Sequence, residues 1–140
     1  PLLPGPASTH TRCACGAIGC VETLVSRDGL LASSRQAGGP RDLQSLIAKL
    51  GNEMPDWLAP SLDAVATTIA GGLNLLGLRD VVLTGELCSA IPAADYLSAS
   101  IRRGAMWARF GEVRCHVAPR NRMAGIASIA IDRLLEARPS

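Results

Sequence analysis

Three thiols and two glycines are concentrated in the short segment CACGAIGC. The thiols have the spacing C-x-C-x4-C and belong to Cys13, Cys15 and Cys20. Thiolates bind soft or borderline metals, and Zn²⁺ takes four ligands at tetrahedral corners. Gly16 and Gly19 allow the loop to turn tightly enough for three sulfurs to converge, and His10 is the local candidate for the fourth ligand. The spacing predicts a metal site suited to zinc, because the alternative of three buried free cysteines gives no reason for the interleaved glycines.

The composition is typical of a globular protein with a core of its own. The 140 residues are 48% hydrophobic and 19% charged, and the net charge of +2 is too small to favour a nucleic-acid surface. The longest apolar stretch, AVATTIAGGLNLLGL, is too polar and too short to span a bilayer. Five cysteines, three of them clustered, suit metal binding better than a disulfide framework. We expect a cytoplasmic protein without a membrane partner, with Cys88 and Cys115 in its core.

The segments that must position the cluster are mainly helical. Helical spacing of apolar residues runs over 22–36, 41–53 and 55–76. We expect the first of these helices to be interrupted at Asp28-Gly29. The third is apolar on nearly all sides, which predicts a buried helix.

Two short runs predict strands. Residues 79–87, RDVVLTGEL, are typical of a buried parallel strand, and residues 113–119, VRCHVAP, alternate as a second strand does. Helices are expected over residues 93–110 and 123–137. The order helix, helix, strand, helix, strand, helix predicts an α/β layered fold.

The string C-x-C-G-x-x-G-C-x-E, from Cys13 to Glu22, resembles the signature of the ROK family (repressor, open reading frame, kinase). LGLRDVVLTGEL resembles the family's strand and the glycine turn of its nucleotide site, which would make Gly85 a cofactor-binding residue. MAGIASIAIDRLL resembles its small-residue C-terminal helix. The resemblance covers essentially the whole chain but only the C-terminal half of a family member.

The resemblance implies an α/β fold, the C-terminal lobe of an actin-like ATPase (ribonuclease H-like) fold with a zinc-binding loop. We expect a single lobe over residues 1–140. Its parts would be a zinc loop (1–21), a helical segment (22–77) and a strand-helix-strand-helix unit (78–140).

The resemblance also implies that the zinc shapes one wall of a sugar pocket and that Glu22 contacts sugar hydroxyls. A carboxylate that accepts from two vicinal hydroxyls reads a sugar well, because charge-assisted hydrogen bonds are strong and directional. The alternative for Glu22 is a helix N-terminal charge that interacts with the dipole. The family's zinc histidine belongs to a Gly-His pair that would lie near Leu3 here. Three possibilities follow: a ligand upstream of Pro1, which we favour, His10 in its place, or a degenerate site.

Family kinases need a phosphate loop and an Asn-Asp pair whose aspartate is the general base, and neither is present in this chain. Glu86, directly after Gly85, would repel a polyphosphate. We therefore expect a sugar-responsive transcriptional regulator, of which this chain is the sugar-sensing and oligomerising portion. Its effector would be a sugar or sugar phosphate, its partner a further copy of itself, and DNA would be bound only through an upstream domain.

Two other functions are compatible with parts of the pattern. The first is an ATP-dependent sugar kinase of the same family, similar to glucokinase or N-acetylhexosamine kinase, with ATP as its cofactor. The second is a free-standing zinc-knuckle module. The second is disfavoured, because the chain has one cysteine cluster and no basic or aromatic stripe beside it.

Overall fold

Helices and a small parallel sheet make up residues 11–118, the part of the chain that the computed structural model describes. The α-helices are α1 (Glu22–Val25), α2 (Arg27–Gln36), α3 (Leu43–Leu50), α4 (Ala59–Leu76) and α5 (Ile91–Gly104). The strands are β1 (Asp80–Thr84) and β2 (Arg114–Ala118), and the 3-10 turns are η1 (Asp56–Leu58), η2 (Leu87–Ser89) and η3 (Met106–Arg109). The predicted helix over 123–137 lies outside the described residues.

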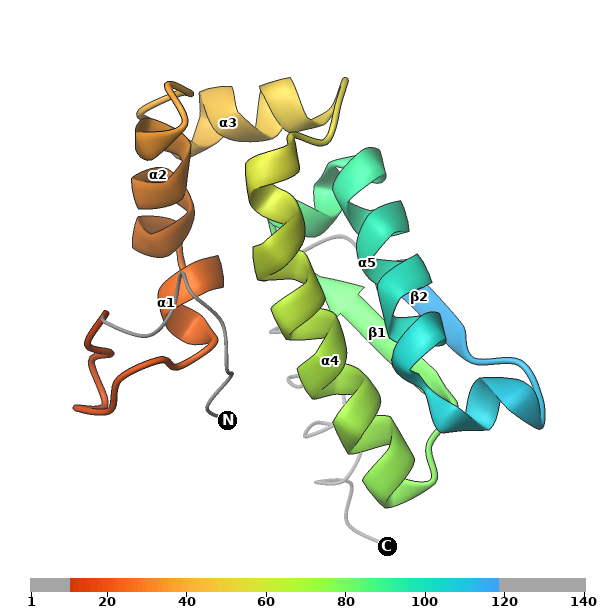
Figure 1. Cartoon of the computed structure of the whole chain (residues 1–140). Helices are drawn as coiled ribbons and strands as arrows, with labels where there is room; N and C mark the ends of the chain where they lie inside the picture. Colours follow the sequence, from red (N-terminus) through yellow and green to blue (C-terminus); the bar gives the residue numbers. More distant parts are fainter. Residues whose placement is uncertain (1–10, 119–140) are drawn as a thin grey trace, which may run out of the picture.

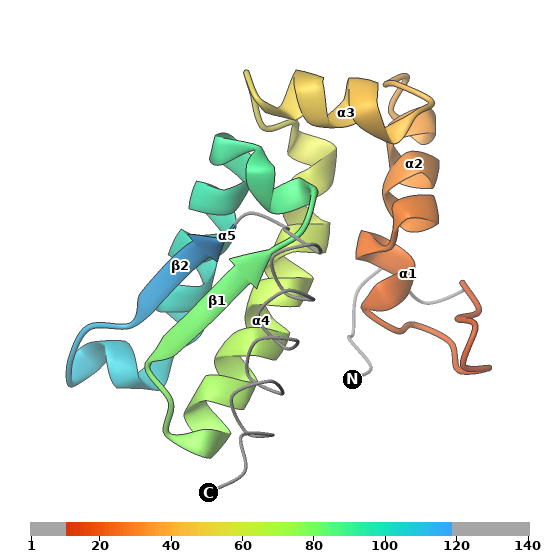
Figure 2. The same cartoon turned by 180° about the vertical axis from the view of Figure 1, so that it is seen from behind.

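The two strands pair in parallel, as the sequence predicts. The register runs from Asp80 opposite Arg114 to Thr84 opposite Ala118. Parallel neighbours need a crossover connection, and α5 supplies it between β1 and β2. The helices α4 and α5 lie side by side on one face of this sheet (Figures 1 and 2).

Two clusters of buried side chains hold the layers together. The first joins α2, α3, the start of α4 and the start of α5 through Leu30, Leu46, Leu50, Leu58, Leu62, Ala90 and Ala93. The second fastens α4 and α5 to the sheet through Ala66, Leu73, Leu83, Leu97, Ile101, Ala105 and Val113. The first cluster therefore positions α2, which adjoins α1 and the cysteine loop (Figure 1).

Burial of α4 and β1 differs from the sequence-based expectation. The expected all-round burial of residues 55–76 is wrong, because Leu75 and Leu76 near the end of α4 are 86% and 67% exposed. The face with Leu62, Ala66, Ala70 and Leu73 is buried, at the three- to four-residue spacing of one helical stripe. The strand over 79–87, which the sequence predicts to be buried, is only partly buried. Leu83 is the one buried residue of β1, and Val82 is 62% exposed.

The break in the first helical segment lies at Ser26, not at the expected Asp28-Gly29. Ser26 has an extended backbone (φ −63°, ψ 160°), and its side chain accepts a hydrogen bond from the Gly29 N–H at 3.3 Å. Serine is a preferred N-cap, so α2 begins directly after it. The helix expected over 93–110 likewise ends early, at Gly104, and η3 follows it. No helix among residues 11–118 is long and apolar enough to cross a membrane.

Candidate metal and ligand site

The cysteine loop is a small hairpin closed by backbone hydrogen bonds. Arg12 and Ile18 form an antiparallel bridge. The Cys13 N–H donates to the Ala17 carbonyl at 2.8 Å, and the Gly16 N–H donates to the Cys13 carbonyl at 2.9 Å. Gly16 and Gly19 have positive φ values of 90° and 78°, which L side chains rarely adopt. The two glycines therefore supply the turns that fold the loop back on itself.

This hairpin brings the three sulfurs together. The Sγ atoms of Cys13, Cys15 and Cys20 all lie within 4.8 Å of one another, and those of Cys15 and Cys20 are 3.6 Å apart. Zn–S bonds of about 2.3 Å in a tetrahedron place sulfurs roughly 3.8 Å apart. The donor set and its spacing therefore fit a metal ion that prefers thiolates, and three close cysteines could bind one.

Hydrogen bonds within the loop shift the pKa values of Cys15 and Cys20 in opposite directions. Hydrogen bonding to the Ala17 backbone, followed by hydrogen bonds with the Cys13 and Cys20 thiols, lowers the pKa of Cys15. The hydrogen bond with Cys15, followed by desolvation, raises the pKa of Cys20 to about 11. This is the pattern of a thiolate that accepts from a neighbouring thiol. A bound cation reverses that preference, because a coordinating thiol gives up its proton.

Glu22 lies beside the cluster. It is the first residue of α1, and its Oε2 atom accepts a hydrogen bond from the Cys13 thiol across 3.6 Å. The side chain is otherwise exposed. The alternative role, a charge at a helix N-terminus, is weak here because α1 has only four residues and few peptide dipoles to sum.

A pocket of about 920 Å³ opens between this loop, α2 and the start of α4. Cys13 and Glu22 line it from the loop and α1, whereas Cys15 and Cys20 do not. Its polar and aromatic lining further includes Arg12, Thr23, Ser26, Asp28, Ser33, Arg35, Gln36, Trp57 and Ser61. Carboxylates, hydroxyls, guanidinium groups and an indole face can together bind a small polar ligand with an apolar side. Sequence reasoning missed Trp57 and Ser61, which carry no local signal and reach the pocket only through the tertiary fold.

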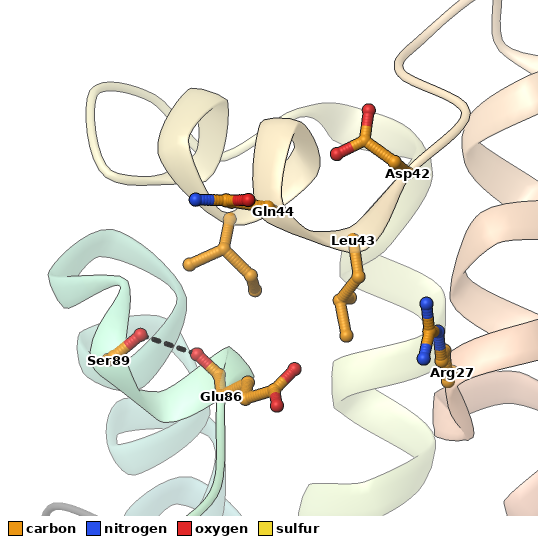
Figure 3. Close-up of a pocket in the computed structure, with 7 residues that line it drawn as sticks. Arg27, Asp42, Leu43, Gln44, Glu86 and Ser89 are labelled. Atoms are coloured by element: carbon orange, nitrogen blue, oxygen red, sulfur yellow. Dashed lines mark hydrogen bonds between the residues drawn. The ribbon is translucent and has the colours of Figure 1, made fainter.

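Gly85, the expected nucleotide-site glycine, lies away from this cluster at the end of β1. Its φ of 124° suits a turn, and no described atom lies within 4 Å of where a Cβ would stand. A second pocket, of about 500 Å³, lies beside this turn. Figure 3 shows Arg27 and Glu86 on opposite sides of it, with Asp42 and Leu43 above. Among the described residues that line this pocket are two carboxylates, Asp42 and Glu86, and the guanidinium of Arg27.

The remaining chemistry-bearing side chains have structural contacts. Asp80 accepts two hydrogen bonds of 2.8 Å from the Arg114 guanidinium, and His116 Nε2 lies 3.3 Å from the same carboxylate. Cys88 and Cys115 are partly buried and pack against the second core cluster. His10, the local candidate for a fourth metal ligand, lies outside the described residues.

Comparison with known proteins gives the family. The ROK family model matches residues 5–126. A solved structure described as a "ROK family transcriptional regulator, homolog of E.coli MLC protein" superposes with a TM-score of 0.62 at 18% sequence identity. The match covers 81% of this chain and 33% of that one, so this chain spans about a third of its length.

No curated protein matches the chain. The likeness shows a shared fold, and the α/β arrangement fits an actin-like ATPase fold. Because the family model matches most of the chain, this protein belongs to the ROK family.

Proposed function

We propose that this chain is the sugar-sensing and oligomerising portion of a sugar-responsive transcriptional regulator. One observation carries the proposal: Glu22, the carboxylate of the family motif, lines a pocket of about 920 Å³ together with Cys13, whose Sγ atom lies 3.6 Å from Glu22 Oε2. The chain therefore has a candidate sugar-binding carboxylate at the junction of a thiol cluster and a ligand-sized cavity. The description of the similar solved structure as a transcriptional regulator supports the same function.

In this proposal the metal is zinc, held by Cys13, Cys15 and Cys20, and its role is structural. Zinc would cross-link the hairpin and so stiffen the pocket wall from which Cys13 faces Glu22. For the fourth ligand we keep the two candidates from the sequence, a residue upstream of Pro1 and, second, His10.

Glu22 would accept hydrogen bonds from neighbouring sugar hydroxyls. Hydrogen bonds to a charged group are each worth about 1.5 to 3 kcal/mol, so loss of this carboxylate should weaken binding about tenfold to a hundredfold. Arg35 lines the same pocket and would pair with the phosphate of a sugar phosphate.

The test is calorimetric titration of the zinc-loaded chain with a panel of hexoses, N-acetylhexosamines and their 6-phosphates. We expect saturable binding of at least one compound, and a Glu22→Gln variant should bind it at least tenfold more weakly. Glu53→Gln is the matched control, because Glu53 is exposed and does not line the pocket. Absence of binding across the panel, or equal affinity in Glu22→Gln and wild type, contradicts the proposal.

Two further points support a regulator that works as part of a larger assembly. The net charge of +2 offers no strong field for DNA, so DNA contact would come from an upstream domain. Exposed Leu75 and Phe110 are suited to contact another copy of the chain. Sedimentation should therefore detect a homo-oligomer, and a monomer at all concentrations would contradict that part of the proposal.

A further inference from the structure

The three thiols of the cluster differ in their surroundings. Cys13 is 7% exposed, lines the pocket and donates to Glu22. Cys15 is exposed and Cys20 half-buried, neither lines the pocket, and their Sγ atoms are 3.6 Å apart. We propose that Cys15 and Cys20 form a disulfide when a hydroperoxide reaches the loop, and that Cys13 stays reduced.

The hairpin brings these two sulfurs close together, and two features argue against a bond from Cys13. A disulfide bond of about 2.05 Å requires the Sγ atoms of Cys15 and Cys20, which are 3.6 Å apart, to approach by about 1.5 Å. The turns at Gly16 and Gly19 already hold the two sides of the loop together. A bond from Cys13 to Cys15 would instead close a strained ring around Ala14 alone. Cys13 is in addition shielded from a solvent oxidant.

The reaction balances with a hydroperoxide as the oxidant. The exposed Cys15 thiolate attacks one peroxide oxygen, the O–O bond breaks, and Cys15 becomes a sulfenic acid while the other oxygen leaves as water or an alcohol. Cys20 Sγ then attacks Cys15 Sγ and gives up its proton. The S–S bond forms, the S–O bond breaks, and the leaving hydroxide takes up that proton as water. Two thiols have lost two electrons and two protons, and the peroxide has gained them.

The modified loop would differ from the reduced loop in metal binding. Thiolates bind zinc, whereas disulfide sulfurs do not replace them, so the disulfide and a three-cysteine metal site exclude each other. Because Cys13 and Glu22 line one pocket, loss of the metal on oxidation would also release Cys13, beside Glu22, from its link to the other two thiols. This consequence for ligand binding rests on the proposed function, whereas formation of the disulfide does not.

The test is peptide mapping of the metal-free chain after treatment with hydrogen peroxide in the presence of a chelator. After alkylation of the remaining thiols, trypsin releases residues 13–27 as one peptide, which contains all three cysteines. Fragment spectra should show Cys13 alkylated and Cys15 linked to Cys20, and the mass of the linked peptide should be lower by two hydrogens. Cys88 and Cys115 lie in other tryptic peptides and report the general reactivity of half-buried thiols.

Matched variants test the pairing independently. Cys13→Ser should still lose two thiols to peroxide, whereas Cys15→Ser and Cys20→Ser should form no disulfide within the loop. Mapping of the wild-type chain supplies the same information where a variant fails to fold. A disulfide that includes Cys13, a bond between two chains, or reaction of Cys88 and Cys115 while the loop stays reduced would each overturn the inference.

Discussion

Replacing Gly29 with Ala should destabilise the chain, whereas the same change at Gly71 should stabilise it. Gly29 lies in the first turn of α2, where α1 passes closely. An added Cβ would stand 2.8 Å from the Thr23 carbonyl carbon and 3.2 Å from that of Leu24, and it would collide with the Thr23 oxygen. Because these are backbone atoms, α1 itself would have to move. Gly71, inside α4, is exposed, and no described atom lies within 4 Å of the place where its Cβ would stand.

Both variants gain stability from the loss of glycine's backbone entropy, and only Gly29→Ala introduces a steric clash. Each gains about 0.5 to 1 kcal/mol, because alanine loses less backbone entropy in a helix than glycine. Gly29→Ala additionally pays an overpacking cost of about 1 to 3 kcal/mol. The difference in unfolding free energy between the variants therefore isolates that cost, and urea unfolding followed by far-UV circular dichroism measures it.

The contact between α1 and α2 at Gly29 also positions Glu22 of the candidate site. Glu22 is the first residue of α1, so a shift of α1 away from α2 moves its carboxylate relative to the pocket. We expect Gly29→Ala to bind ligand more weakly, and Gly71→Ala to bind it as wild type does. If the two variants were equally stable, the close passage of α1 over Gly29 would be refuted, and with it this explanation of how Glu22 is positioned.

Three further outcomes are expected. Leu50→Ala should lower the unfolding free energy by about 2 to 5 kcal/mol in urea unfolding, because Leu50 is fully buried in the first core cluster; a loss under 1 kcal/mol would contradict that burial. Ser34→Ala should cost about 1 to 3 kcal/mol, because it leaves the Pro40 carbonyl without its 2.8 Å hydrogen bond; an unchanged urea midpoint would count against this contact. The Arg114 guanidinium lowers the pKa of Asp80, so the carboxylate stabilises the fold above the ordinary pKa of about 4 and loses that effect as the pH falls through the lowered value. The stability difference between wild type and Asp80→Asn should thus be present at pH 7 and shrink below about pH 4, and a difference that grows with acid would refute the pairing.

Over residues 11–118, local patterns were sufficient to predict the order of the main helices and strands. β-branched runs on either side of an amphipathic segment predict two parallel strands joined by a helix, which β1, α5 and β2 confirm. The glycine-interrupted spacing of the cysteines predicts that their sulfurs converge, and they do. The family signature is likewise local, and the family match confirms it. The zinc and sugar roles of these residues stay predictions.

Features that depend on tertiary contact could not be predicted in this way. Apolar character alone does not distinguish a helix covered on every side from one covered on a single face, so the exposure of Leu75 was missed. Trp57 reaches the Glu22 pocket from a distant part of the sequence, with no motif to mark it.

The zinc content of the purified chain, measured by elemental mass spectrometry, tests most directly whether the cysteine cluster is a metal centre. We expect about one zinc per chain, because three clustered thiolates favour that ion and water can take a fourth position that no side chain fills. Cys13→Ser and Cys20→Ser should lose most of it, while Cys88→Ser, which alters a thiol outside the cluster, should keep it. A wild-type chain without zinc, or cluster variants that retain it in full, would contradict the assignment of this loop as the metal-binding wall of the ligand pocket.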